Sequence, residues 1–159
     1  IKSANYKNIV EVGASNGYSG LWLANAAKTT GGKVITVEFH KCRFDVAKAN
    51  FEECGLSDFI EIRQEMAIDM LNELTKEDFN TKDERFIDFA FVDANKAQYI
   101  KYYEIIDKKL KKGGMICFDN MISHKEKVED LYETIITNPD YQTEMFPSQA
   151  GLLIALKVN

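Results

Sequence analysis

The chain has 159 residues, of which 45% are hydrophobic, and this length and composition favour one domain around a single core. A formal net charge of -5 argues against the broad basic surface that is typical of proteins that bind nucleic-acid backbones. No apolar run reaches the length of a membrane span, and Cys42, Cys54 and Cys117 have neither the spacing of a zinc site nor the even number of a disulfide framework. We therefore expect a protein of the reducing cytoplasm, without membrane contact.

The first predicted elements are an apolar strand over residues 8–12, a turn that contains glycines, and a helix from Tyr18 to Lys28. Glycine at the head of a helix lets backbone N–H groups and the positive end of the helix dipole approach a ligand. The dinucleotide fingerprint needs glycines at relative positions 1, 3 and 6, where this chain has Gly13, Ser15 and Tyr18. The turn therefore indicates a nucleotide-cofactor site of another kind, and an ordinary tight turn is the alternative.

The residues Glu11, Gly13 and Gly17 form an arrangement that resembles motif I of class I methyltransferases, which bind S-adenosylmethionine. In the helix that follows, Trp22 is expected to pack against the core, with a place beside a ligand as the alternative. The helix is predicted to end at the two glycines at 31–32, which suit a helix exit.

The second strand, over residues 33–38, is a β-branched run that ends on the carboxylate of Glu38. Such a run is typical of a buried parallel strand. Glu38 lies about 20 residues beyond the glycine turn, the separation at which an acidic side chain accepts hydrogen bonds from ribose hydroxyl groups. We therefore assign Glu38 to a ribose, with a solvated acid at a strand end as the alternative.

The remaining pattern alternates helices and strands and ends in two strands. It first predicts a helix with Phe44, Ala47, Phe51 and Cys54 inward, a strand over 59–63, a short helix over 66–74 with Met70, Leu71 and Leu74 inward, and a charged surface loop over 75–85. A strand over 86–92, a helix over 96–111 and a strand over 115–118 follow. The pattern then predicts a helix that begins with a capping box of Ser123 and Glu126 and has Val128, Leu131 and Ile135 inward, and finally strands over 141–146 and 152–157. The turn between the last two strands is too short for a crossover helix, so they are expected to pair antiparallel. The pattern thus predicts seven strands in one α/β domain.

Polar side chains follow the fourth and fifth predicted strands. Asp93 follows the fourth strand, and Asp119 and Asn120 follow the fifth. Because ligands bind beyond the carboxyl ends of parallel strands, we expect these side chains to lie together at a site. Carboxylate and amide oxygens suit Mg²⁺ better than zinc or copper. A helix cap is the alternative role for Asp93, but it explains neither Asn120 nor the nearby Lys96.

Five segments of the chain together resemble one protein family. They are VEVGASNGYSG, VITVE, FVDANKAQYIKYYE, GGMICFDNMISH and GLLIALK, and they occur in the family's order over nearly the whole chain. The chain is similar to the cation-dependent O-methyltransferases related to catechol and caffeoyl-CoA O-methyltransferases. The resemblance implies a Rossmann-like three-layer sandwich with a mostly parallel sheet, S-adenosylmethionine as cofactor, S-adenosylhomocysteine as product, and Mg²⁺ or a similar divalent cation.

The resemblance also implies roles for individual residues. Asp93 and Lys96 correspond to a metal ligand and the catalytic lysine after the family's fourth strand, and Asp93 is counted among the catalytic residues as well. Asp119 and Asn120 correspond to the other two metal ligands. The residues assigned to the cofactor are Glu11, Gly13, Ala14, Ser15, Gly17, Ser19, Glu38, Phe39, Met66, Ala67 and Asp93.

The chain departs from the family's pattern at two places. The family usually has Gly-x-Ala near the adenine, where this chain has Glu65, Met66 and Ala67, and Met66 is expected to pack on the adenine ring. Family members also carry helices ahead of the first strand, which wall the acceptor site and make dimer contacts. This chain begins almost directly on its first strand without an initiator Met, so we expect a fragment or a processed form that retains cofactor binding.

These patterns lead to one expected function and three alternatives. We expect Mg²⁺-dependent O-methylation of a small catechol-like acceptor, with Lys96 as the group that removes the acceptor's proton. The alternatives are methylation of a hydroxylated wobble uridine in tRNA, nicotinamide-dependent dehydrogenation, and cofactor binding without catalysis. His124 is expected to be a solvated residue, with a place in the acceptor pocket as its alternative. The resemblance leaves a homodimer open.

Overall fold

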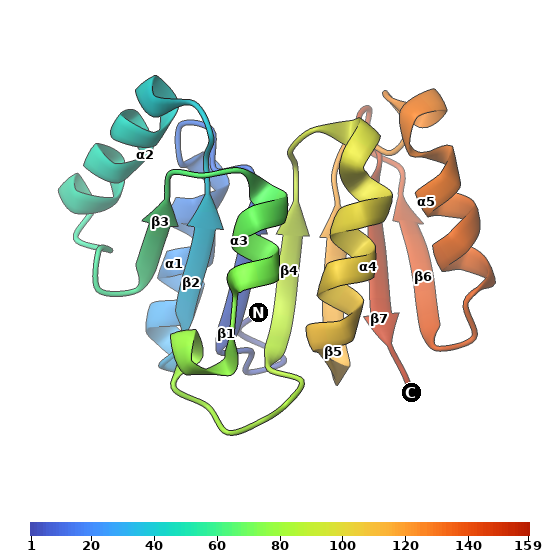
Figure 1. The fold of residues 1–159 in the computed structure, drawn as a ribbon, viewed down its shortest axis with the longest axis horizontal. Helices are drawn as coiled ribbons and strands as arrows, with labels where there is room; N and C mark the ends of the chain where they lie inside the picture. Colours follow the sequence, from blue (N-terminus) through green and yellow to red (C-terminus); the bar gives the residue numbers. More distant parts are fainter.

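The computed structural model describes residues 1–159, and its centre is a seven-stranded sheet (Figure 1). The strands are β1 (Asn8–Val12), β2 (Lys33–Val37), β3 (Ile60–Arg63), β4 (Ile87–Val92), β5 (Leu110–Phe118), β6 (Tyr141–Phe146) and β7 (Leu152–Lys157). Their order in the sheet is β3-β2-β1-β4-β5-β7-β6, and β7 runs antiparallel to both of its neighbours, β5 and β6. The predicted mostly parallel sheet and its antiparallel C-terminal hairpin are confirmed.

Helices cover both faces of this sheet. They are α1 (Tyr18–Thr30), α2 (Lys41–Glu53), α3 (Ala67–Glu73), α4 (Tyr99–Lys109) and α5 (Lys125–Thr137), with the short 3-10 helices η1 (Lys76–Phe79) and η2 (Lys96–Gln98). Helices α3, α4 and α5 pack on one face, in front of the sheet in Figure 1, and α1 and α2 pack on the other. The predicted three layers are therefore confirmed. None of these helices is both long and apolar enough to cross a membrane.

The apolar stripes predicted for two helices on the front face are buried. The side chains concerned are Met70, Leu71 and Leu74 at α3, and Val128, Leu131 and Ile135 on α5. Burying an aliphatic side chain of this size contributes about 1.5–3 kcal/mol of transfer free energy. The stripes therefore set which side of each helix faces the sheet.

Two side chains that were predicted to be inward are exposed. Cys54 follows the last turn of α2, because that helix ends at Glu53, and it faces solvent. Trp22 is 64% exposed on α1, where Leu23, Ala24 and Ala27 form the buried side instead. The packing expected for Trp22 is therefore wrong, and it does not line the cavity described below.

The predicted helix over 96–111 and the strand after it have different limits in the structure. The helix divides into η2 and α4, and β5 begins at Leu110 instead of residue 115. Gly113 has a φ of 78° and lies inside β5, where the register with β4 is irregular. The two glycines at 113–114 therefore allow a bulge in a longer strand, and they do not precede the strand.

The predicted capping box at the start of α5 does not form. His124 is the residue before the first turn, and no side chain caps that turn. The hydroxyl of Ser123 lies 3.4 Å from the main-chain oxygen of Asn120, which holds it in the loop after β5. A capping box does occur in the charged loop over 75–85, where Thr75 and Asp78 cap η1.

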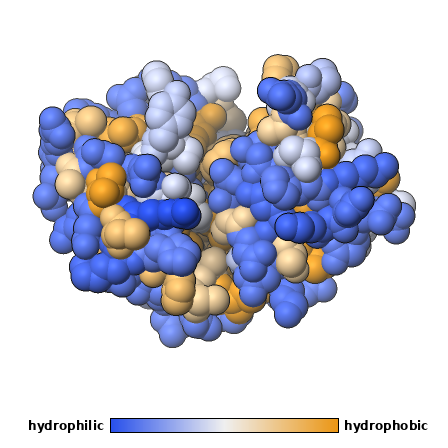
Figure 2. Space-filling view, turned by 90° about the horizontal axis from the view of Figure 1, so that it is seen from above, coloured by the Kyte–Doolittle hydropathy of each residue, from blue (hydrophilic) through white to orange (hydrophobic).

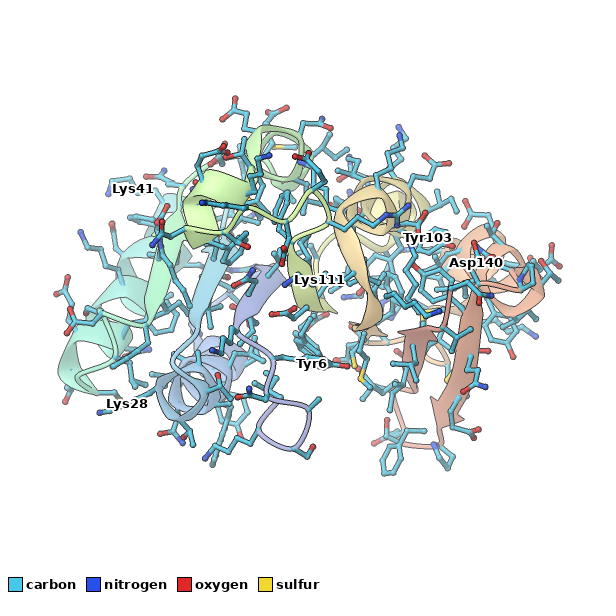
Figure 3. All side chains as sticks on the ribbon, turned by 90° about the horizontal axis from the view of Figure 1, so that it is seen from below. Tyr6, Lys28, Lys41, Tyr103, Lys111 and Asp140 are labelled. Carbon is cyan, nitrogen blue, oxygen red and sulfur yellow. The ribbon has the colours of Figure 1, made fainter.

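Polar contacts hold the amino-terminal edge of the sheet, which Figure 3 shows from below. The Tyr6 hydroxyl donates to the main-chain oxygen of Gly113 at 2.6 Å. Lys111 Nζ lies 3.0 Å from the Asp83 carboxylate and 3.1 Å from that of Asp88. The polar residues predicted for the site lie at the opposite edge.

Candidate active site

A cavity of about 800 Å³ opens at the carboxyl-terminal edge of the sheet, within the size range of small-molecule sites. Figure 2 looks onto this edge and shows the surface hollowed near its middle. The lining includes nine of the residues predicted for the site: Gly13, Ser15, Glu38, Phe39, Met66, Ala67, Asp93, Lys96 and Asn120. Five predicted residues, Glu11, Ala14, Gly17, Ser19 and Asp119, lie outside this lining.

The turn between β1 and α1 approaches the end of β4 too closely for a side chain at its first glycine. Gly13 has a φ of 102°, and a Cβ there would lie 2.4 Å from the main-chain oxygen of Asp93. Gly17 has a φ of 87° and is the cap residue of α1, and Ser15 between them has a φ of 49°. Glycine is therefore required at Gly13, where the turn forms part of the cavity wall.

Glu38 connects the loops that follow β1 and β2. Its carboxylate accepts hydrogen bonds from the N–H of Ser15 at 2.9 Å and from the N–H of His40 at 2.8 Å. The residue is 7% exposed, so water satisfies little of its charge. Each carboxylate oxygen can accept a further hydrogen bond, so this geometry fits a ligand with two hydroxyl groups.

Glu11 lies behind the glycine turn. Its Oε2 accepts a hydrogen bond from the Thr36 hydroxyl at 2.6 Å, whereas Oε1 is buried without a hydrogen-bond partner. Burial, together with the Asp93 charge, raises the pKa of Glu11 to about 7, although the hydroxyls of Ser19 and Thr36 oppose this shift. Oε2 also lies 3.0 Å from where a Cβ on Gly20 would be, so Glu11 faces α1 and supports the turn from inside the protein.

A tyrosine connects the ends of β4 and β5. The single hydroxyl hydrogen of Tyr99 is shared between the main-chain oxygens of Val92 and Asp119, each of which lies 3.1 Å from the hydroxyl oxygen. Burial raises the pKa of Tyr99 above its usual range, with smaller contributions from Asp93 and Asp119, so the hydroxyl keeps its proton. Beside it, Lys96 Nζ lies 2.6 Å from Asp93 Oδ1, which places a cation and a carboxylate on the cavity wall.

The three predicted metal ligands come from these same strand ends. Asp93 and Asn120 line the cavity, while Asp119 lies next to them and accepts the N–H of Asn120 at 2.8 Å. Asn120 has a φ of 63°, a conformation that asparagine tolerates better than most residues. No three His, Cys, Asp or Glu side chains form a cluster, but two carboxylates and an amide oxygen are hard donors that suit Mg²⁺. The oxygen donors of Asp93, Asp119 and Asn120 therefore have the chemistry that Mg²⁺ requires of its ligands.

His124 lies outside the cavity. It is exposed, and its Nδ1 lies 3.0 Å from the Ser123 hydroxyl. The structure therefore supports a solvated residue at the start of α5 and not a residue of the cavity wall.

Comparison with known proteins places this chain in a family. The model of a family described as O-methyltransferase matches residues 1–140. The chain belongs to the O-methyltransferase family. It is 33% identical over 122 residues to tricin synthase 1 of Oryza sativa subsp. japonica, and the aligned region covers 77% of this chain and 48% of that protein. It is 34% identical over 116 residues to a catechol O-methyltransferase of Niastella koreensis, and the aligned region covers 73% of this chain and 50% of that protein. The chain thus spans about half the length of these two relatives.

Solved structures share the fold of this O-methyltransferase family member. The O-methyltransferase TomG from Streptomyces achromogenes, in complex with S-adenosylmethionine, matches with a TM-score of 0.88 and 22% identity, over 99% of this chain and 76% of TomG. An O-methyltransferase from Bacillus cereus, in complex with S-adenosylhomocysteine, matches with a TM-score of 0.84 and 27% identity, over 98% of this chain and 76% of that one.

In this O-methyltransferase family member, several cavity residues were not assigned from the sequence. They are Val37, His40, Arg43, Glu65, Ala94, Asn95, Gln98 and Tyr102. Most of these residues lie within a few positions of a strand end that the sequence predicted. Their place in the loops after β2, β3 and β4 could therefore have identified them as candidates for the site. Gln98 and Tyr102 are a helical turn apart, a spacing at which two side chains share a helix face.

Proposed function

We propose that this protein transfers the methyl group of S-adenosylmethionine to a hydroxyl group of a small acceptor with vicinal hydroxyls, with assistance from Mg²⁺. One observation carries the proposal: a single cavity contains the Gly13 turn, the Glu38 carboxylate, and the group formed by Asp93, Lys96 and Asn120. Family membership and the cofactor complexes of structural relatives support it.

Glu38 and the Gly13 turn are the residues that would hold the cofactor. The carboxylate of Glu38 is oriented by two backbone N–H groups, and its remaining lone pairs can accept the two ribose hydroxyls. Gly13 has no side chain and lines the cavity, so its backbone allows close approach of the amino-acid end. S-Adenosylmethionine supplies an electrophilic methyl group on a sulfonium.

Asp93, Asp119 and Asn120 would hold the metal ion. Mg²⁺ bound there supplies a Lewis acid, which makes a nearby hydroxyl group more acidic. This matters because a phenol has a pKa near 10 and is mostly protonated at pH 7. Lys96 Nζ lies on the cavity wall beside Asp93, and as a neutral amine it would take the proton from the acceptor hydroxyl. Transfer also needs an in-line approach of the acceptor oxygen to the cofactor's methyl group, which binding of both molecules in one cavity would favour.

Replacing Glu38 by glutamine is expected to weaken binding of S-adenosylhomocysteine at least about 100-fold, or about 3 kcal/mol. The amide has one acceptor oxygen for two backbone N–H donors, so the turn loses a contact and the ribose loses its charged acceptor. Isothermal titration calorimetry measures the effect. Glu144→Gln is a matched control, because Glu144 is exposed on β6 and outside the cavity. Wild-type binding of NAD without binding of S-adenosylhomocysteine would contradict the proposal.

Replacing Asp119 by alanine is expected to remove Mg²⁺-dependent acceptor binding while cofactor affinity changes less than about threefold, since Asp119 lies outside the cavity lining. Binding of a catechol to the protein saturated with S-adenosylhomocysteine is measured with Mg²⁺ and with excess chelator. Wild-type affinity should fall at least about tenfold in chelator, and the variant should show the low affinity in both. Equal wild-type affinity in the two conditions would mean that the acceptor does not need the metal.

A further inference from the structure

The proposed metal ligands come from two different strand ends, so their spacing depends on what joins those ends. Asp93 directly follows β4, and Asp119 and Asn120 directly follow β5. The last backbone hydrogen bond between the two strands joins the N–H of Asp119 to the main-chain oxygen of Val92 at 3.0 Å. Mg²⁺ requires near-octahedral geometry with ligand distances of about 2.0–2.1 Å, so a site for this ion needs the two ends held at a fixed separation.

Tyr99 joins the two strand ends beyond that last backbone bond. Its hydroxyl hydrogen is shared between the main-chain oxygens of Val92 and Asp119. The oxygen of Val92 also accepts the N–H of Asp119, whereas Tyr99 is the only protein group that donates to the oxygen of Asp119. That oxygen belongs to the planar peptide group between Asp119 and Asn120, whose orientation sets ψ of the first and φ of the second. The hydroxyl therefore fixes a peptide group that two of the proposed ligands share.

The ring of Tyr99 is held independently of its hydroxyl. It is fully buried, and its centroid lies 5.8 Å from that of Phe118 and 6.3 Å from that of Tyr102. Lys96 Nζ lies 5.6 Å from the same centroid, so the ring face also supports the lysine. Replacing Tyr99 by phenylalanine therefore removes the hydroxyl contacts and leaves the aromatic packing in place.

We propose that Tyr99 is a positioning residue for the divalent cation, an inference that rests on the proposed function. Its shared hydroxyl hydrogen holds the end of β4 against the peptide group after Asp119, so that the oxygen donors of the two strands keep the spacing that the ion requires. Tyr99 lies outside the cavity lining, so it acts through the ligands and is not one of them. Groups that orient metal ligands in this way change metal affinity about 10- to 100-fold when they are removed.

Tyr99→Phe should therefore weaken binding of Mn²⁺ at least about tenfold, while the affinity for S-adenosylhomocysteine changes less than about threefold. Mn²⁺ prefers the same oxygen donors as Mg²⁺, and electron paramagnetic resonance measures its binding to the protein saturated with S-adenosylhomocysteine. Tyr103→Phe is the matched control. It removes a hydroxyl from a buried tyrosine of the same helix, but this hydroxyl bonds Asn138 Nδ2 at 2.9 Å and lies outside the cavity. The control should keep the wild-type affinity for Mn²⁺.

Amide hydrogen exchange tests the same contact without a metal. The N–H of Asp119, which bonds the oxygen of Val92, should exchange at least about tenfold faster in Tyr99→Phe than in the wild type. In Tyr103→Phe the same N–H should exchange within about threefold of the wild-type rate, since that change leaves the strand ends joined.

Equal affinity of the wild type and Tyr99→Phe for Mn²⁺ would overturn the inference and leave the proposed function standing. An equal loss of affinity in Tyr103→Phe would also overturn it, because general destabilisation would then explain the effect. So would an unchanged exchange rate at Asp119 in Tyr99→Phe, because the hydroxyl would then not hold the strand ends. A wild type that binds S-adenosylhomocysteine but no Mn²⁺ would overturn the metal assignment of the proposed function together with this inference.

Discussion

Replacing Lys96 by methionine is expected to lower kcat for methyl transfer about a thousandfold, while the affinity for S-adenosylhomocysteine changes less than about threefold. Lys96 Nζ lies 2.6 Å from Asp93 Oδ1 on the cavity wall, and its side chain is 16% exposed. Methionine has a similar length but cannot take a proton, so under the proposed function the acceptor hydroxyl would lose its proton acceptor. Initial rates with S-adenosylmethionine and a vicinal dihydroxyphenyl acceptor measure kcat.

Two further variants separate proton transfer from charge. Lys96→Arg keeps a cation beside Asp93, but a guanidinium does not deprotonate, so kcat should stay within about tenfold of the methionine variant. Lys101→Met removes an exposed lysine of α4 and should leave kcat within about twofold of the wild type. If Lys96→Arg recovers most of the wild-type kcat, Lys96 acts through its charge alone and not as the proton acceptor.

Replacing Lys157 by methionine is expected to lower the free energy of unfolding by about 2–4 kcal/mol. Lys157 is 3% exposed, and its Nζ donates to Asp107 Oδ1 at 2.5 Å and to the main-chain oxygen of Asp107 at 2.9 Å. The Tyr141 hydroxyl donates to the same carboxylate oxygen at 2.6 Å. These bonds join β6 and β7 to the end of α4, and without Lys157 the partly buried carboxylate loses its cation.

Urea unfolding at pH 7 measures this difference, and Lys33→Met is the matched control. Lys33 Nζ lies 2.7 Å from Glu61, but the two side chains are 38% and 39% exposed. Exposed ion pairs contribute about 0–1 kcal/mol, so the control should cost less than about 1 kcal/mol. Equal losses for the two variants would show that burial does not make the Lys157 pair the stronger one.

The cost of Lys157→Met is also expected to shrink in acid. Burial opposes ionisation of Asp107, but hydrogen bonds from Lys157 and Tyr141 and the charges of Lys157 and Arg85 outweigh it, so its pKa lies below the usual 3.8. A carboxyl group with a lowered folded-state pKa contributes stability above its unfolded-state pKa, and that contribution is lost as the pH falls through the folded-state value. The difference between wild type and variant should therefore be full at pH 7 and decrease below about pH 4.

Much of the fold was predictable from local pattern. The buried stripes of α3 and α5 were read correctly, because apolar periodicity depends only on residues that are close along the chain. The turn of the last hairpin was too short for a helix, which was enough to predict its antiparallel pairing. The start of β5 was not predictable in the same way, since Leu110 belongs to a strand only through its pairing with Ile87 on β4.

The sequence by itself determined which residues stand at the strand ends, and so it located the edge of the sheet that has the cavity. Only the tertiary structure decided which of those residues face the cavity. Glu11 and Glu38 are both acids of buried strands, yet Glu11 faces α1 while Glu38 reaches the cavity wall. Likewise, Glu65 and Gln98 share one cavity because α3 and α4 pack on the same face of the sheet. Side-chain direction and helix packing depend on residues far apart in the chain, and local pattern does not contain that information.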